Sequence, residues 1–137
     1  MSLFVDTSIW YAAVDLDDSA NSSAKTILSS GEALVTTDHV LAETWLLLHH
    51  KLNRQAAERF WAGLRSGGAS IEPVTLSDLE AAWQIGQSWT DQDFSIVDRT
   101  SFAVMQRLGM SRATSLDNHF AVYRFGPNRR QSFTIVR

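Results

Sequence analysis

The sequence predicts an α/β fold with a mainly parallel central sheet and helices on both faces. Short apolar runs, typical of strands covered on both sides, alternate with longer segments of helical period. The connections between the runs are too long for hairpins and therefore indicate crossovers, which join parallel strands. With 137 residues, 45% of them apolar, and no cysteine, we expect residues 1–137 to form one domain around its own core.

The first predicted strand is Leu3-Phe4-Val5, and it delivers Asp6 directly to its carboxyl end. Ligands of open α/β sheets bind just outside the carboxyl ends of the strands, so Asp6 is a candidate site residue. The alternative is local, an Asx turn or the cap of a helix that begins at the next residues. Other carboxylates have to decide between the two interpretations.

Two further helices and a strand follow in the first half of the chain. Residues 19–29 have a helical period that ends before Gly31, and residues 33–36 form a short strand. Thr37 or Asp38 caps a stronger helix that reaches residue 52 and has a broad apolar face. This order of elements continues the strand-and-helix alternation.

The second half repeats the alternation. Its predicted elements are helices over residues 54–66, 77–89 and 95–109, strands over residues 71–74 and 113–115, and an edge strand over residues 133–136. Ser77 with Glu80 predicts a capping box that opens the helix at residue 77. The tryptophans at positions 45, 61, 83 and 89 are expected in the core or in subunit contacts.

Charge is distributed unevenly along the chain. Residues 1–98 carry 5 basic and 14 acidic side chains, whereas residues 99–137 carry 7 arginines and one aspartate, so the two parts have net charges of −9 and +6. Arginine forks match phosphate oxygens, and an acidic body with an arginine-rich end suggests a polyanion that approaches one side of an acidic site. Ordinary solubilising surface charge is the alternative.

Four carboxylates, those of Asp6, Glu43, Asp98 and Asp117, come from separate parts of the chain. The predicted fold brings at least three of them to strand ends or helix starts on one edge of the sheet. Such a cluster repels itself, and a hard divalent cation, Mg²⁺ or Mn²⁺, is the partner that satisfies it most simply. The residues therefore predict a metal site that binds phosphate and activates water.

Each of these carboxylates also has a local interpretation. Glu43 could be an exposed helix glutamate, Asp98 could be the reciprocal half of a capping box with Ser95, and Asp117 could belong to a turn. The apolar neighbours of Glu43 and the largely apolar helix after Asp98 favour the site. The cap and the metal roles of Asp98 are expected to exclude each other.

Four segments resemble the signatures of PIN-domain ribonucleases, and the length and order resemble VapC toxins of toxin-antitoxin pairs. The segments are Phe4-Val-Asp-Thr-Ser, Thr37-Asp-His-Val-Leu-Ala-Glu-Thr, Asp93-Phe-Ser-Ile-Val-Asp-Arg-Thr-Ser-Phe-Ala-Val-Met and Thr114-Ser-Leu-Asp-Asn-His-Phe. Residues 12–32 and 53–88 carry no signature. The resemblance implies a single PIN-like domain.

The resemblance also implies roles for individual residues. Asp6, Glu43 and Asp98 correspond to metal ligands, direct or through water, and Asp117 to the fourth acidic member, which makes these four the expected catalytic and metal-binding residues. Asp93 falls where relatives often have an acid and is left outside this set. Substrate contacts are expected from Thr7, Ser8 and Arg99, the last because it adjoins Asp98. Thr7 or Ser8 is also expected to hydrogen-bond a ligand carboxylate.

The expected function is hydrolysis of RNA phosphodiester bonds with Mg²⁺ or Mn²⁺, by a toxin that a cognate antitoxin inhibits and that forms a homodimer. A non-catalytic binding module and a DNA-directed nuclease remain alternatives. A Mg²⁺-dependent phosphatase lacks its second Asp, because that position is Ser8. The absence of cysteine suits a reducing cytoplasm, and no apolar run is long enough for a membrane span.

Overall fold

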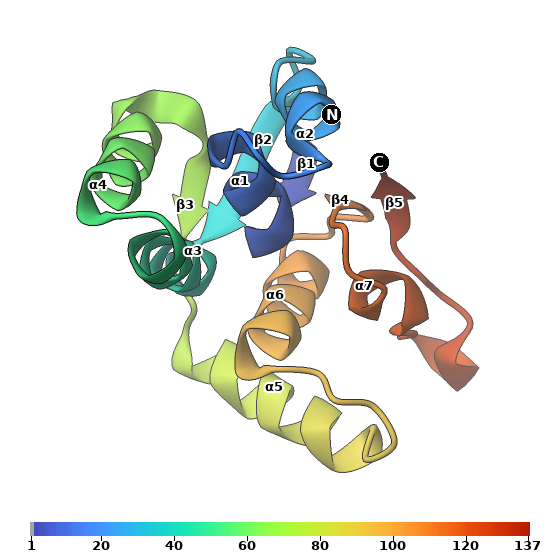
Figure 1. Cartoon of the computed structure of the whole chain (residues 1–137). Helices are drawn as coiled ribbons and strands as arrows, with labels where there is room; N and C mark the ends of the chain where they lie inside the picture. The colour runs from blue at the N-terminus through green and yellow to red at the C-terminus, as the bar shows by residue number, and fades with distance from the viewer. Residues whose placement is uncertain (1) are drawn as a thin grey trace.

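Five parallel strands form the central sheet of the computed structural model, which describes residues 2–137. Position 1, which the predicted domain includes, lies outside the described residues. The strands are β1 (Ser2–Val5), β2 (Ala33–Thr37), β3 (Ser70–Glu72), β4 (Arg112–Thr114) and β5 (Thr134–Val136). Their order in the sheet is β3-β2-β1-β4-β5, with β5 at an edge as expected (Figure 1).

Seven α-helices flank the sheet and confirm the predicted α/β class. They are α1 (Thr7–Val14), α2 (Asn21–Leu28), α3 (Asp38–Lys51), α4 (Arg54–Gly63), α5 (Leu76–Ser88), α6 (Ile96–Arg107) and α7 (His119–Val122). The connections from β1 to β2 and from β2 to β3 carry α1 to α4, and those from β3 to β4 and from β4 to β5 carry α5 to α7. Figure 1 separates these groups, blue to green and yellow to red. No helix within residues 2–137 is long and apolar enough to cross a membrane.

The strand β1 is the centre of the sheet. Leu3, Phe4 and Val5 are fully buried, as the apolar run predicted. The chain runs from β1 through β2 to β3 on one side and then returns to β4 and β5 on the other. The sheet thus has its topological switch point between β1 and β4, where α/β folds bind ligands. Asp6 follows β1 there, and Ser115 follows β4.

Helix starts position the other candidate residues. Thr37 caps α3 by accepting a hydrogen bond from the backbone N–H of Val40 at 3.0 Å. Ser95 caps α6, where its side chain accepts from the N–H of Asp98 and the Asp98 carboxylate accepts from the N–H of Ser95, both at 3.0 Å. This capping box orients the first turn of α6 and fixes the position of the Asp98 carboxylate.

The predicted capping box of α5 was wrong by two residues. Thr75 and Asp78 form it, and the helix begins at Leu76. The predicted pair, Ser77 with Glu80, has the same spacing as the observed pair. Asp78, however, is buried and also binds the guanidinium of Arg107 from α6, with Nη2 2.9 Å from Oδ2. The tertiary ion pair therefore selects the start of the helix, which sequence spacing alone does not.

Several boundaries and two short elements differ from the sequence prediction. The helix α2 begins at Asn21, because Asp18 Oδ1 accepts from the N–H of Ala20 in a turn before it. The predicted helix over residues 54–66 passes into a π-turn, η1 (Leu64–Gly68). The short helix α7 and the 3₁₀ turn η2 (Pro127–Arg129) were not predicted.

The expectation for the tryptophans holds in part. Trp45 and Trp89 pack partly buried against the core. Trp61 and Trp83 are 43% and 60% exposed, so neither lies in the core, and their expected place in subunit contacts stays a prediction. A helical period marks which face a residue occupies, but it does not say whether another element covers that face.

Candidate active site

The carboxylate of Asp6 is built into the fold at the switch point. Asp6 occupies the N-cap position of α1 but makes no side-chain cap, and it is only 4% exposed. Its Oδ2 instead accepts hydrogen bonds from the hydroxyls of Ser8 and Ser115, both at 2.9 Å. Within residues 2–137 its Oδ1 makes no hydrogen bond. The local alternative for Asp6 is thus not the role of its side chain.

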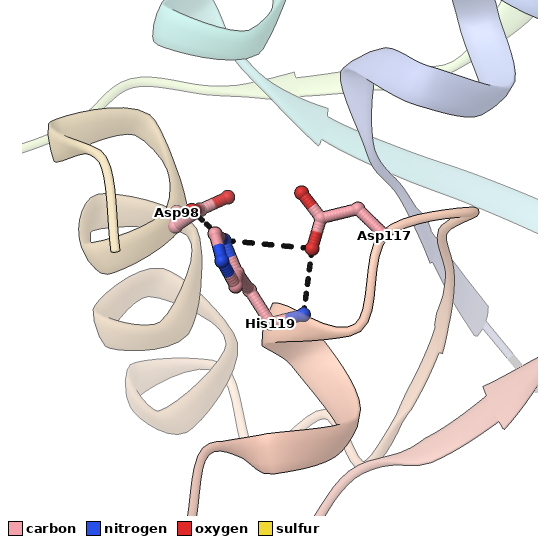
Figure 2. Close-up of side chains that lie close together, drawn as sticks. All are labelled: Asp98, Asp117 and His119. Carbon is pink, nitrogen blue, oxygen red and sulfur yellow. Dashed lines mark hydrogen bonds and ion pairs between the residues drawn. The ribbon is translucent and has the colours of Figure 1, made fainter. Parts of the chain in front are cut away.

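Asp98, Asp117 and His119 form a compact group beside it. Figure 2 shows the three side chains pointing toward one another from α6, from the loop after β4 and from the start of α7. His119 Nδ1 lies 2.7 Å from Asp98 Oδ2 and 3.5 Å from Asp117 Oδ1. One potential ligand atom from each residue lies within 4.8 Å of the others.

The loop after β4 joins this group to Asp6. Ser115 donates to Asp6 and accepts from the N–H of Asp117 at 3.2 Å. Asp117 Oδ1 in turn accepts from the N–H of His119 at 2.6 Å. The guanidinium of Arg137 donates to the carbonyl oxygen of Ser115 at 3.2 Å and closes the loop from outside. A short chain of hydrogen bonds therefore fixes Asp6 and Asp117 relative to each other.

The electrostatics of the group resist negative charge. Burial, together with the nearby charges of Asp98 and Asp117, raises the pKa of Asp6 to about 6, although the hydrogen bonds from Ser115 and Ser8 oppose it. Burial also raises the pKa of Asp98, despite the hydrogen bond from His119. Burial would lower the pKa of His119, but its hydrogen bond with Asp98 and the charge of Asp117 raise it. The site therefore favours protons or another cation.

The donor set fits a divalent cation. Carboxylate oxygens are the ligands that Mg²⁺ and Mn²⁺ prefer, and imidazole suits the transition metal of the two. Oδ1 of Asp98, like that of Asp6, makes no hydrogen bond within residues 2–137 and is available to a cation. The raised pKa values of Asp6 and Asp98 indicate that the metal-free site disfavours two negative charges, which a bound cation would compensate.

Glu43 is not drawn into the compact group by any hydrogen bond or ion pair within the described chain. It lies partly buried on α3, one turn after His39. The ring of His39 reaches Thr100 of α6, with Nδ1 3.5 Å from Oγ1, so this face of α3 lies against α6. Asp93 is exposed in the loop before α6. The expected role of Glu43 as a metal ligand therefore remains a proposal.

The three expected substrate residues behave differently. Ser8 donates to Asp6 and also accepts from the N–H of Leu116 at 2.9 Å, so it holds the site together. Thr7 is buried, and its Oγ1 has no hydrogen-bond partner within residues 2–137. The guanidinium of Arg99 donates to the carbonyl of Ala82 in α5 at 3.3 Å. Arg99 is turned toward α5, because successive helical residues point about 100° apart, and its expected substrate contact stays a prediction.

Three residues of the site were missed by sequence reasoning. His119 and Ser115 lie within the fourth signature segment but were given no role, and Arg137 was one of seven arginines without distinction. A histidine two residues after an aspartate is a weak signal by itself. Only the pairing of β1 with β4 brings Ser115 to Asp6 and His119 to Asp98.

The comparisons with known proteins agree with this geometry. The sequence profile of the PIN domain matches residues 3–126. The chain belongs to the PIN-domain family. It is 36% identical over 124 residues to the 23S rRNA-specific endonuclease VapC20 of Mycobacterium tuberculosis. The aligned residues cover 90% of this chain and 95% of the relative.

Several solved structures have the same fold. The crystal structure of M. tuberculosis VapC20, a toxin that cleaves the sarcin-ricin loop, matches with a TM-score of 0.83 and 35% identity over 87% of this chain and 92% of that one. A toxin-antitoxin complex from Klebsiella pneumoniae matches with a TM-score of 0.65, 14% identity and coverages of 88% and 91%. VapBC2 of Rickettsia felis, bound to a promoter DNA fragment, matches with a TM-score of 0.65 and 10% identity over 86% of this chain and 89% of that one. The last two support the fold alone.

Proposed function

We propose that this PIN domain is a divalent-cation-dependent endoribonuclease that hydrolyses RNA phosphodiester bonds. The observation that carries the proposal is the meeting of Asp6, Asp98, Asp117 and His119 at the switch point between β1 and β4. The identity of 36% to an endoribonuclease over nearly the whole chain supports the same reaction. In this proposal residues 1–137 act as one domain.

Asp6, Glu43, Asp98 and Asp117 hold Mg²⁺ or Mn²⁺ in this proposal. When bound, such a cation attracts phosphate oxygens and lowers the pKa of water, which is the chemistry that hydrolysis requires. Ser8 and Ser115 fix Oδ2 of Asp6, while the N–H of Ser95 and the ring of His119 fix Oδ2 of Asp98. These contacts leave one oxygen of each carboxylate for the ligand.

The arginine-rich end of the chain supplies fewer phosphate contacts than its composition suggested. Arg107 pairs with Asp78, and Arg112 pairs with Glu32. Arg99 lies against α5, and Arg124 donates to carbonyls around the end of α7. Arg129 and Arg137 also donate to backbone carbonyls, and Arg130 makes no hydrogen bond or ion pair within residues 2–137. These three arginines are exposed and are the candidates for phosphate contacts.

The substrate class we propose is ribosomal RNA, because the relative at 36% identity acts on 23S rRNA. A cytoplasmic location follows from that substrate. A ribonuclease toxin needs an inhibitor, and we propose a cognate antitoxin whose C-terminal segment covers the acidic site. We also propose that the protein forms a homodimer.

Matched RNA and DNA oligonucleotides separate this proposal from its alternatives. The purified protein should cut the RNA strand in Mn²⁺ or Mg²⁺, leave the DNA strand intact, and cut neither when EDTA is present. Preferential cutting of the DNA strand would make the protein a DNA-directed nuclease. Intact strands under all conditions would make it a non-catalytic binding module.

Mn²⁺ or Mg²⁺ should also stabilise the fold, because a ligand that binds only the folded state shifts unfolding by mass action. At a hundredfold excess over Kd the gain is about 2.7 kcal/mol, which corresponds to a rise of roughly 5–10 °C in the melting temperature. Ca²⁺, which demands less of the geometry, should bind without supporting cleavage. A melting temperature unchanged at millimolar Mn²⁺ would remove the metal site from the account.

A further inference from the structure

A cation–π pair lies beside the acidic site and has no part in it. Arg129, at the end of the turn η2, places Cζ 4.5 Å from the centre of the Trp89 ring. Its Nη2 donates to the carbonyl of Ser88 at 3.3 Å. Arg129 is exposed and Trp89 is partly exposed, so the guanidinium covers the indole and turns its other face to solvent. Nε and Nη1 make no hydrogen bond within residues 2–137.

The loop that carries Arg129 is closed and fixed. Phe125 and Gln131 exchange two backbone hydrogen bonds of 3.0 Å at its base. Asn128 and Arg129 both have left-handed backbone conformations, with φ of 58° and 53°, as no other non-glycine residue within residues 2–137 does. Asparagine tolerates this conformation readily, but arginine seldom adopts it. A strained arginine held in one place on an aromatic ring indicates a function for that placement.

The pair lies close to the catalytic carboxylates. Trp89 packs against Phe94 with ring centres 5.7 Å apart, and Phe94 packs edge-on against His119 at 5.2 Å. One aromatic ring therefore separates the Trp89 ring from the ring that binds Asp98, and the two lie within about 11 Å of each other. A strand with one nucleotide per 3.4 Å spans that distance with about three stacked nucleotides.

We propose that Arg129 and Trp89 form a stacking platform for a base of single-stranded RNA about three nucleotides from the scissile phosphate, a proposal that rests on the function above. The planar guanidinium stacks on aromatic faces, so Arg129 lies between the indole and an unstacked base. Its free N–H groups reach a neighbouring phosphate oxygen. Arg130, the next residue, is also exposed, makes no hydrogen bond within residues 2–137 and lies over no ring there.

Two RNA probes separate stacking from charge. Binding of a short oligouridine and of its abasic counterpart is measured by fluorescence anisotropy in EDTA, with the strands checked to be intact afterwards. Arg129→Lys keeps the charge but removes the planar group, so it should weaken oligouridine binding roughly tenfold and leave abasic binding unchanged. Arg130→Asn removes the charge of a residue that lies over no ring within residues 2–137, so it should weaken both strands alike.

Arg129→Asn makes the test independent of folding. Asparagine suits the left-handed backbone, so this variant should melt at about the wild-type temperature and still lose oligouridine affinity. The platform is overturned if Arg129→Lys binds oligouridine like wild type, if wild type binds both strands equally, or if the variants change only the melting temperature. Base-dependent binding by a protein that cuts nothing supports the platform and rejects the nuclease.

Discussion

Asp98→Asn should reduce RNA cleavage at least about a hundredfold, whereas Asp78→Asn should leave cleavage near the wild-type rate. The two aspartates are matched in local structure. Each is the third helical residue of a capping box, with Ser95 or Thr75 as its partner, and they are 7% and 3% exposed. They differ in what lies opposite, since Asp78 faces Arg107 and Asp98 faces His119 and Asp117.

The variant that keeps its cleavage, Asp78→Asn, should be the one that loses stability. The pKa of Asp78 is lowered, because the hydrogen bonds from Arg107 and Thr75 outweigh burial, so its surroundings favour the charge. Asp78→Asn should therefore lose about 1–2 kcal/mol, or roughly 3–8 °C in melting temperature. The raised pKa of Asp98 means that its surroundings disfavour the charge, so Asp98→Asn should melt no lower than wild type without metal and gain less from Mn²⁺.

Cleavage rates and thermal melts of the two variants check this pair of results. Near-normal cleavage by Asp98→Asn would end its role as a ligand. The structure also corrects the expectation that cap and ligand exclude each other: one oxygen of Asp98 serves the helix start and His119, and the other makes no hydrogen bond within residues 2–137.

Asp6→Asn should stabilise the metal-free protein at neutral pH and have almost no effect near pH 4. The pKa of Asp6 is about 6 in the fold against an ordinary value of 3.8, so the folded state holds the proton more tightly. The stability from that proton is present below the ordinary pKa and is lost as the pH rises through 6. The loss amounts to about 3 kcal/mol above pH 7. Asparagine does not ionise and avoids it.

Two other groups give the wild-type protein the same direction of change. The pKa values of Asp98 and His119 are both raised in the fold, so each also loses stability as the pH rises. The carboxyls whose pKa is lowered, those of Asp15, Glu32 and Asp78, act in the opposite sense but only below their ordinary values. From about pH 5 to 8, the metal-free wild type should therefore become steadily less stable.

Thermal melts in a chelator across that range give the measurement. The melting temperature of Asp6→Asn should exceed that of wild type by roughly 5–10 °C at pH 8, with a difference that shrinks toward pH 4. A pH-independent difference, or an Asn variant that melts lower at pH 8, would mean that Asp6 is not a buried, repelled carboxylate. Added Mn²⁺ should reverse the order, since only wild type keeps all of its ligands.

The sequence predicted most of what depends on local pattern. The buried run before Asp6 and the helix starts at Thr37 and Ser95 are local signals, and the structure has these elements as expected. What sequence could not supply depends on pairing between distant segments. The register of β1 against β4 brings Ser115 to Asp6, and an ion pair with Arg107 decides which capping box opens α5.

The orientation of side chains was the other limit. Arg99 follows Asp98 directly, yet its guanidinium packs against α5, where a Cβ on Gly86 would overlap it. Arg129, far from Asp98 in the chain, is separated from His119 only by the rings of Trp89 and Phe94. Proximity to the site follows the packing of α5, α6 and α7, which is a tertiary property.

Sequencing of the RNA ends produced from purified ribosomes tests the central claim most directly. Wild-type protein with Mn²⁺ or Mg²⁺ should generate discrete new ends in ribosomal RNA, and these ends should vanish with EDTA and with Asp98→Asn but persist with Asp78→Asn. Ends that appear equally in EDTA or with Asp98→Asn would show that the acidic group at the switch point is not what cuts the RNA.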